Sequence, residues 1–512
     1  MEATAERLLR WPDLLILAIF LGIVIAIGVY SARKMKSADN YFLAGRSLPG
    51  WAVGLSMMAT IASSLTFLAL PGKTFHGNWE FIPSQVLYFL PVFLAYFIFM
   101  PFFRRSAFRS AYEYLEHRFG TWARVYSASI YVGHNMFRLG LILYITSIPL
   151  QQMSGWSMPT IIVVLGILVA VYTIAGGLEA VIYTDVLQAI ALYVGGLICI
   201  PIIIDLLPGG ASQLFADANA NGKFSLGNTS FTLSETTVWS YILLFQFLFI
   251  QYFASDQTVV QRYLAMKSDK EAKRGLIIGT VVAVPVWAYF AFVGTALWVF
   301  YLNFPSAAVD AMEPEGVFTY FILTKIPAGL TGFVIFGILA AAMSSLDSTL
   351  NATAAVMNND FYKRFESVAK REKRYLVAGR WFTAIIAVFM IGVALGIHFM
   401  RNDTLMDLMS FALGLISAGL LGILYLAFFT TRIGSKAAAI GLIATVLFVT
   451  LWVFLTTDTG EALLPGLASL VPSRFWIAVL PNLFLILVAF PTSLIFPRNS
   501  DKSLQGLTVW TN

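Results

Sequence analysis

The sequence predicts an all-α polytopic membrane protein. Hydrophobic residues make up 59% of its 512 residues and charged residues only 12%, about half of the ~25% that soluble domains carry. The mean hydropathy is +0.79, and apolar runs of about 20 residues, long enough to cross ~30 Å of hydrocarbon, recur to the end of the chain. So little charge cannot cover the surface of a water-soluble protein.

Thirteen apolar runs are candidate membrane spans. They begin near residues 12, 50, 82, 124, 158, 180, 237, 275, 330, 376, 405, 435 and 474. No small-residue cleavage site follows the first run, so we expect a retained span rather than a signal peptide. The longer segments 208–236 and 303–328 contain Gly, Ser, Asn and Pro, and we expect short helices or caps there.

Lysine and arginine are concentrated in alternate loops. Of the 33 basic residues, 25 lie in segments 33–49, 104–124, 262–274, 363–380, 432–436 and the tail from 498. Seven lie on the other side: Arg7, Arg10, Lys73, Lys223, Lys325, Arg401 and Arg474. The positive-inside rule then predicts an external N-terminus and a cytoplasmic C-terminus in a plasma membrane, such as a bacterial inner membrane. Arg138 remains, midway along a run, and we expect it to be the one buried cation.

Several classes of function are excluded by composition. The single cysteine, Cys199, allows neither an intrachain disulfide nor a thiolate zinc site. Gly72-Lys73-Thr74 resembles the end of a phosphate-binding loop, but the first glycine that such a loop requires would stand where Phe67 is. We therefore expect an ion gradient as the energy source, with no organic cofactor, no nucleic acid and no obligate protein partner.

The second apolar run carries small and hydroxyl-bearing residues at mid-membrane, within residues 56–67. Such residues allow a helix to unwind, because their side chains replace lost backbone partners. A break would free the carbonyls of Ala59 and Ala62 for a cation, and would aim the amides and hydroxyls of Ser63 and Thr66 at an anion. Close packing of small residues against another helix is the alternative.

Two further runs contain carboxylates, which are costly in hydrocarbon. Asp185 lies just inside the run that begins near residue 180, where it either binds a ligand or snorkels to the membrane edge. Ser344, Asp347 and Ser348 lie at i, i+3 and i+4 and so share one helix face. Their oxygens suit a hard cation such as sodium. Back-bonding to the helix would explain the serines but not the aspartate.

Arg138 is permanently charged, and its planar fork fits a carboxylate. Its partner is either a substrate carboxylate or a protein carboxylate such as that of Asp185 or Asp347. Phe81 and Gln85, one turn apart in the third run, either line a pocket or pack in the core.

These residues resemble those of the sodium/solute symporter family, which includes the sodium-coupled glucose, proline, iodide and sialic acid carriers. The resemblance is carried by residues 172–185 with Gln188 and by residues 340–348. It extends to residues 41–46, 110–115 and 259–263, and so covers nearly the whole chain.

The resemblance implies a LeuT-type fold with two five-helix inverted repeats. These would occupy residues 50–207 and 237–430, with a leading helix in 1–49, an extracellular loop in 208–236 and two trailing helices in 431–512. A first sodium site would comprise Ala59, Ala62, Ala341, Ser344 and Ser345. A second sodium site, present in some members, would comprise Asp185, Ser344, Asp347 and Ser348. Because Asp347 replaces a serine of the sialic acid carriers, the number of sodium ions stays open.

Within the family, the chain resembles the bacterial sialic acid symporters most. In that subgroup Ser63, Thr66 and Arg138 would bind the substrate carboxylate, and Phe81 and Gln85 would line the pocket. The expected function is sodium-coupled import of a carboxylated sugar, sialic acid (N-acetylneuraminate), by alternating access. The alternatives are symport of another sugar, a monocarboxylate or an amino acid such as proline, and, from other classes, a membrane enzyme or an ion channel.

Overall fold

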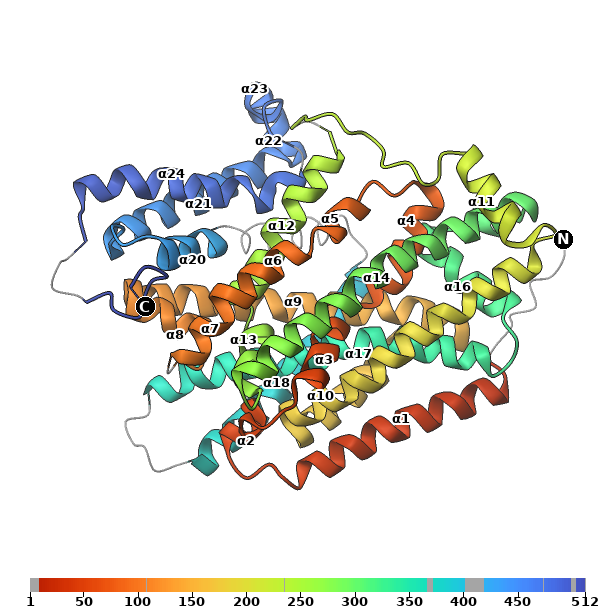
Figure 1. Cartoon of the computed structure of the whole chain (residues 1–512), viewed down its shortest axis with the longest axis horizontal. Coiled ribbons are helices and arrows are strands. Elements are labelled where there is room, and N and C mark those ends of the chain that lie inside the picture. The colour runs from red at the N-terminus through yellow and green to blue at the C-terminus, as the bar shows by residue number, and fades with distance from the viewer. Residues whose placement is uncertain are drawn as a thin grey trace.

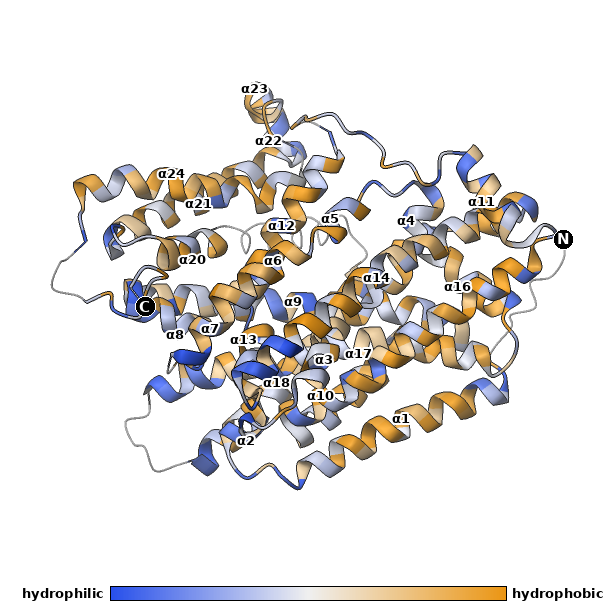
Figure 2. Ribbon diagram, in the orientation of Figure 1, coloured by the Kyte–Doolittle hydropathy of each residue, from blue (hydrophilic) through white to orange (hydrophobic). Residues whose placement is uncertain are grey.

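The computed structural model describes residues 9–106, 108–233, 235–365, 372–400, 419–472, 474–498 and 503–511. In these ranges nine helices have the length and hydropathy of membrane spans, and one bent helix pair makes a tenth. The helices lie side by side at oblique angles (Figure 1), and most of their length is made of hydrophobic residues (Figure 2). An all-helical multi-pass membrane protein is therefore confirmed.

The helix bounds follow the predicted runs closely. The first half contains α1 (Trp11–Ala32), α2 (Ala38–Leu43), α3 (Gly50–Ile61), α4 (Leu70–His76), α5 (Ile82–Val86), α6 (Phe89–Leu94), α7 (Met100–Arg105), α8 (Ala111–Phe119), α9 (Thr121–Ser154), α10 (Met158–Leu206) and α11 (Gly210–Ala220). The second half contains α12 (Val238–Ser255), α13 (Gln257–Ala265), α14 (Asp269–Asn303), α15 (Ala307–Asp310), α16 (Pro314–Lys325), α17 (Leu330–Val356), α18 (Glu372–Met400), α20 (Leu420–Phe429), α21 (Ser435–Leu455), α22 (Asp458–Leu463), α23 (Pro465–Ala468) and α24 (Leu480–Ile495). The predicted run near 405 begins outside the described residues.

Two predicted runs, beginning near 158 and 180, are joined in α10. This element has 49 residues, about 73 Å at 1.5 Å per residue, which is enough to cross the hydrocarbon twice. It is interrupted at Gly177, whose backbone angles (φ 57°, ψ −154°) are not helical. A Cβ on Gly177 would lie 2.5 Å from the carbonyl oxygen of Tyr41. Glycine is therefore required at this point both by conformation and by space.

The helix α17 lies at the centre of the molecule. In its membrane-spanning stretch 89% of the residues are buried, whereas the corresponding share in α1 is 22%. The helices α1, α9, α10 and α18 all pack against α17. Polar side chains on α17 consequently face protein on every side, which is where a buried polar cluster can be stabilised.

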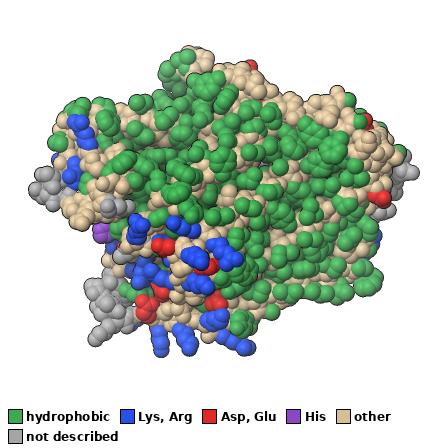
Figure 3. All heavy atoms as spheres, in the orientation of Figure 1, with side chains coloured by type: hydrophobic (Ala, Val, Ile, Leu, Met, Phe, Trp, Pro, Cys, Tyr) green, Lys and Arg blue, Asp and Glu red, His purple; other side chains and the backbone are tan. Residues whose placement is uncertain are grey.

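The basic segments meet at one end of the molecule. Figure 3 shows lysine and arginine side chains gathered where α2 and α13 lie. Leu48 and Met266 pair their backbones there, and Arg104 Nε lies 2.5 Å from Asp269 Oδ1. One residue of the predicted basic loops departs from this pattern. Arg262 lies within α13 and is fully buried, so the expectation that Arg138 is the one buried cation is wrong.

Candidate functional site

The second predicted span is broken where the sequence indicates. The helix α3 ends at Ile61, and Ala62 leaves helical geometry (φ −79°, ψ 76°). A π-helical turn from Leu65 to Ala69 then leads into α4, and the two halves are bent by 61°. Ser64 fixes the break, since its hydroxyl accepts a hydrogen bond from Thr146 of α9 over 3.0 Å.

Buried serines of α17 reach the carbonyls at the end of α3. The Ser344 hydroxyl donates to the Ala59 carbonyl over 2.9 Å and lies 3.2 Å from the Ala341 carbonyl. The Ser345 hydroxyl donates to the Thr60 carbonyl over 3.0 Å. The structure thus brings Ala59, Ala341, Ser344 and Ser345 together beside the break. These groups offer oxygen atoms only, the donor set that a hard monovalent cation prefers.

Asp185 is fully buried and does not snorkel to the membrane edge. Its Oδ2 lies 3.1 Å from Arg262 Nη2 and accepts hydrogen bonds from Ser56 and, over 3.3 Å, from Ser348. Arg262 Nη2 also donates to the hydroxyls of Ser348 over 2.7 Å and of Thr60 over 2.9 Å. The guanidinium therefore lies among residues that the resemblance assigns to a second sodium.

Asp347 is held from a different direction. Its Oδ2 accepts a hydrogen bond from the Tyr172 hydroxyl of α10 over 2.7 Å. The Ser344 hydroxyl, one turn earlier, points to α3 instead. Of the four expected second-site residues, Asp185 and Ser348 therefore bond to each other and to Arg262. Asp347 and Ser344 bond elsewhere, to Tyr172 and to the Ala59 carbonyl.

Sequence reasoning missed Arg262. Arg262 is the first residue of the basic segment 262–274, and the charge pattern of that segment predicts a loop. The only local signal is that the nine residues of α13 contain no other charged side chain. Its partner cannot be read from the neighbouring sequence, because Asp185 lies on α10, 77 residues away in the chain.

The expected substrate residues divide between two cavities. The first, here called the Arg138 cavity, has a volume of about 470 Å³, and its lining includes Thr60, Ser63, His134, Arg138 and Asp256. Arg138 makes no ion pair or hydrogen bond with a described residue. Neither Asp185 nor Asp347 is its partner, since Asp185 pairs with Arg262 and Asp347 accepts a hydrogen bond from Tyr172.

The second cavity, here called the Lys73 cavity, has a volume of about 310 Å³. Thr66, Phe81 and Gln85 line it with Lys73. Ser63 and Arg138 thus line one cavity and Thr66, Phe81 and Gln85 the other, and a substrate site of all five residues stays a prediction. Ser63 and Thr66 are three positions apart in the broken helix, so both cavities adjoin it.

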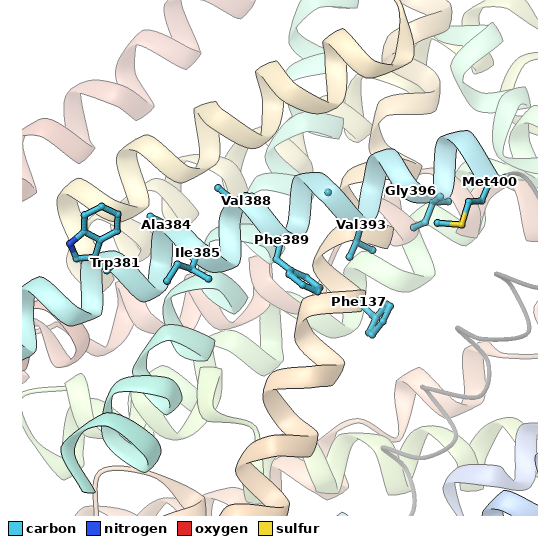
Figure 4. A pocket seen from close by; sticks show the side chains of 11 residues that line it. Phe137, Trp381, Ala384, Ile385, Val388, Phe389, Val393, Gly396 and Met400 are labelled. Atoms are coloured by element: carbon cyan, nitrogen blue, oxygen red, sulfur yellow. The ribbon is translucent and has the colours of Figure 1, made fainter. Parts of the chain in front are cut away.

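A larger, apolar groove of about 680 Å³ runs along α18 (Figure 4). It is lined by Phe137 of α9 and by residues of α18 between Trp381 and Met400. Trp381 and Val388 are 66% and 71% exposed there. None of the described residues that line the groove is charged, so the groove does not suit a charged solute.

Comparison with known proteins agrees with this geometry. Residues 41–445 match the model of the Sodium:solute symporter family. The chain is 30% identical to the sodium/sialic acid symporter NanT of Aliivibrio fischeri over 94% of this chain and 93% of that protein. It is 31% identical to the sodium/sialic acid symporter SiaT of Proteus mirabilis, with 84% and 87% covered.

A solved structure described as the substrate-bound outward-open state of a Na⁺-coupled sialic acid symporter superimposes with a TM-score of 0.86. It is 28% identical in sequence, and the match covers 96% of this chain and 99% of that one. The expected LeuT-type fold is thereby confirmed. Sodium and a solute are the transported species, and the protein is a transporter rather than an enzyme. The chain belongs to the sodium:solute symporter family.

Proposed function

We propose that the protein imports a sialic acid, N-acetylneuraminate, together with sodium by alternating access. The observation that carries this proposal is Arg138, which faces a cavity beside the broken helix without a carboxylate partner among the described residues. A guanidinium fork in such a place fits a solute carboxylate through two parallel hydrogen bonds. The similarity to two sodium/sialic acid symporters at about 30% identity supports the same substrate.

The two halves of the broken helix contact different parts of the substrate. Ser63 joins Arg138 at the carboxylate, while Thr66, Phe81 and Gln85 contact the substrate when the two cavities merge in another conformation. The expected repeats, 50–207 and 237–430, supply the parts that rock against each other. Sodium binds first and orders the helix break, which lowers the cost of forming the substrate pocket.

The first sodium binds between Ala59, Ala62, Ala341, Ser344 and Ser345. In this structure the two serine hydroxyls donate to backbone carbonyls. Bound sodium would take over the Ala59 carbonyl, and the two hydroxyls would turn a lone pair toward the ion. Their O–H groups would donate to the Ala341 carbonyl, which lies 3.2 Å from Ser344 Oγ and 3.4 Å from Ser345 Oγ. The exchange keeps every buried polar atom partnered, which is the condition for a reversible site in hydrocarbon.

A second sodium, at Asp185, Ser344, Asp347 and Ser348, requires Arg262 to leave. Its guanidinium already supplies a positive charge to Asp185 and donates to Ser348. Two cations at this place would repel each other strongly at low dielectric. We therefore infer that Arg262 and a second sodium alternate during the transport cycle.

The protein lies in a plasma membrane with its basic end in the cytoplasm. The gathering of lysine and arginine near α2 and α13 supports this orientation. The end at which α4 and α11 lie would then face outward.

Uptake of radiolabelled N-acetylneuraminate into proteoliposomes tests the function. An inward sodium gradient should drive accumulation, and an equal potassium gradient should not. Arg138→Gln should abolish uptake, while Arg138→Lys, which keeps the charge but loses the fork, should retain only a small fraction. Uptake that is indifferent to sodium, or unchanged in Arg138→Gln, would overturn the proposal.

A thermal-shift screen separates the possible substrates. N-acetylneuraminate, glucose, pyruvate and proline are each added in sodium and again in potassium. A ligand at a hundred times its Kd stabilises the folded state by about 2.7 kcal/mol. A shift with glucose, pyruvate or proline, and none with the sialic acid, would reassign the substrate.

A further inference from the structure

We propose that Lys73 is a second anion-binding group, which receives the solute carboxylate in the Lys73 cavity before the carboxylate reaches Arg138. This inference rests on the proposed function, because it requires an anionic solute. It assigns a role to a residue that neither the phosphate-loop comparison nor the expected substrate site explains.

The ammonium of Lys73 is held in a defined position. Its Nζ lies 2.7 Å from the Tyr241 hydroxyl and 4.0 Å from the centre of the Tyr241 ring. The Phe81 ring lies on another side, with its centre 4.9 Å away. Aromatic faces attract a cation without neutralising it. The charge is therefore fixed in place and remains available to an anion.

The surroundings of Lys73 suit an anionic group. Thr66 and Gln85, which the family resemblance assigns to substrate binding, line the same cavity. Lys73 itself is exposed, whereas Thr66 is 9% and Gln85 4% exposed. A solute entering this cavity therefore passes the ammonium before it reaches the buried amide and hydroxyl.

One acidic residue lies near enough to interact with Lys73, and it does not close the site. Glu80 interacts with Lys73 through its charge, but no ion pair within 4.0 Å joins the two side chains. The Glu80 carboxyl carbon lies 3.0 Å from the Cβ position of Gly227, and Glu80 is not among the residues that line the cavity. There Glu80 weakens the attraction for an anion without occupying the place beside Nζ.

Two cations in series have a physical advantage over one. Ser63 lines the Arg138 cavity, and Thr66, three positions later in the broken helix, lines the Lys73 cavity. A carboxylate moving between the cavities would lose its hydration shell, at a cost of several kcal/mol, unless a charge met it at each stage. Lys73 at the first stage and Arg138 at the second reduce that cost.

Kinetic constants for N-acetylneuraminate uptake test this role. Lys73→Gln should raise KM about threefold to tenfold and change the maximal rate less than twofold, whereas Lys73→Arg should remain near the parent. The control is Lys325→Gln, because Lys325 is an exposed lysine on α16 and its loss changes the net charge equally. An unchanged KM in Lys73→Gln, or an equal rise in the control, would overturn the proposal.

Chemical modification of a Lys73→Cys variant separates the effect of the charge at position 73 from the effect of side-chain shape. The only native cysteine, Cys199, is fully buried, so water-soluble methanethiosulfonates should react at position 73 alone. The aminoethyl reagent should restore a low KM, the methyl reagent should not, and the negatively charged sulfonatoethyl reagent should raise KM further. Equal KM values after all three reagents would overturn the proposal. Failure of the parent protein to take up sialic acid with sodium would instead refute the proposed function.

Discussion

Arg262 and Asp185 form a buried ion pair, with 3.1 Å between Nη2 and Oδ2 and side chains 1% and 0% exposed. The pair joins α13 to α10, and hydrogen bonds from Arg262 to Ser56 and Thr60 extend it to the broken helix. Because Arg262 also donates to Ser348 of α17, one cation connects four elements at the centre of the molecule. Any movement of α13 away from α10 must break these bonds together.

Loss of the Arg262 charge should destabilise the protein strongly. Arg262→Met leaves Asp185 buried without its cation, which costs about 3 to 5 kcal/mol when one partner of a buried pair is removed. The double variant Arg262→Met, Asp185→Asn removes both charges and should recover most of that loss. Thermal unfolding of the purified protein in detergent measures both. A double variant as unstable as the single one would show that the two residues are not energetic partners.

Removal of a serine hydroxyl beside the break should weaken sodium binding. Ser344→Ala deletes a proposed ligand, and we expect the sodium concentration for half-maximal uptake to rise about tenfold, which corresponds to ~1.4 kcal/mol. The matched control is Ser147→Ala on α9, since the buried Ser147 hydroxyl donates only to the Leu143 carbonyl of its own helix. Equal sodium dependence in both variants would exclude Ser344 as a ligand.

The break in α10 should tolerate no side chain. Gly177→Ala places a Cβ where φ is positive and ψ is near −154°, a region populated almost only by glycine. The same Cβ would lie 2.5 Å from the Tyr41 carbonyl oxygen. We expect the free energy of unfolding to fall by more than ~3 kcal/mol, and thermal unfolding measures this change. Gly22→Ala serves as the control, because no atom lies within 4 Å of the Cβ that it adds. The prediction fails if the two variants unfold alike.

Stability at acid pH should depend on Glu116 at the basic end. Burial raises the pKa of its carboxyl, but hydrogen bonds from Arg124 and Thr121 and the charges of Arg124 and Arg364 outweigh burial, and the net pKa lies below 4.5. A carboxyl with a lowered pKa stabilises the folded state above its unfolded pKa. This contribution should therefore be lost as the pH falls below about 4.5.

The variant Glu116→Gln should be less stable at pH 7 and should lose less stability between pH 5 and pH 3. Circular dichroism melting across that interval measures the difference. Arg364 Nη2 lies 2.9 Å from Glu116 Oε1, so Arg364→Gln should flatten the pH dependence in the same direction. A pH dependence in Glu116→Gln as steep as in the parent would contradict this assignment.

Much of the fold was predictable because it depends on local properties. Apolar runs must be helical in hydrocarbon, since each backbone amide needs a partner within its own segment. The predicted starts near 50, 82 and 158 therefore coincide with α3, α5 and α10 to within a residue. The break after Ile61 was equally visible, because small and hydroxyl-bearing residues cluster in that segment.

The site was less predictable because a buried charged residue pairs with a residue from a distant segment, which the local sequence does not identify. Arg138 and Arg262 are chemically the same residue, and their local sequences do not tell which one is paired. The fold brings the Asp185 carboxylate of α10 to 3.1 Å from the Arg262 guanidinium of α13, so these two residues pair. Arg138 faces an open cavity instead.

The amino-acid sequence alone determined that this protein crosses the membrane many times, where its second span breaks, and that another span carries oxygen-bearing side chains on one helix face. Those properties follow from hydropathy and from residue types within single segments. Only the tertiary structure decided which cation meets which carboxylate, and that Lys73 shares a cavity with Thr66 and Gln85. Such pairings depend on distances between segments far apart in the chain, and packing of the helices sets those distances.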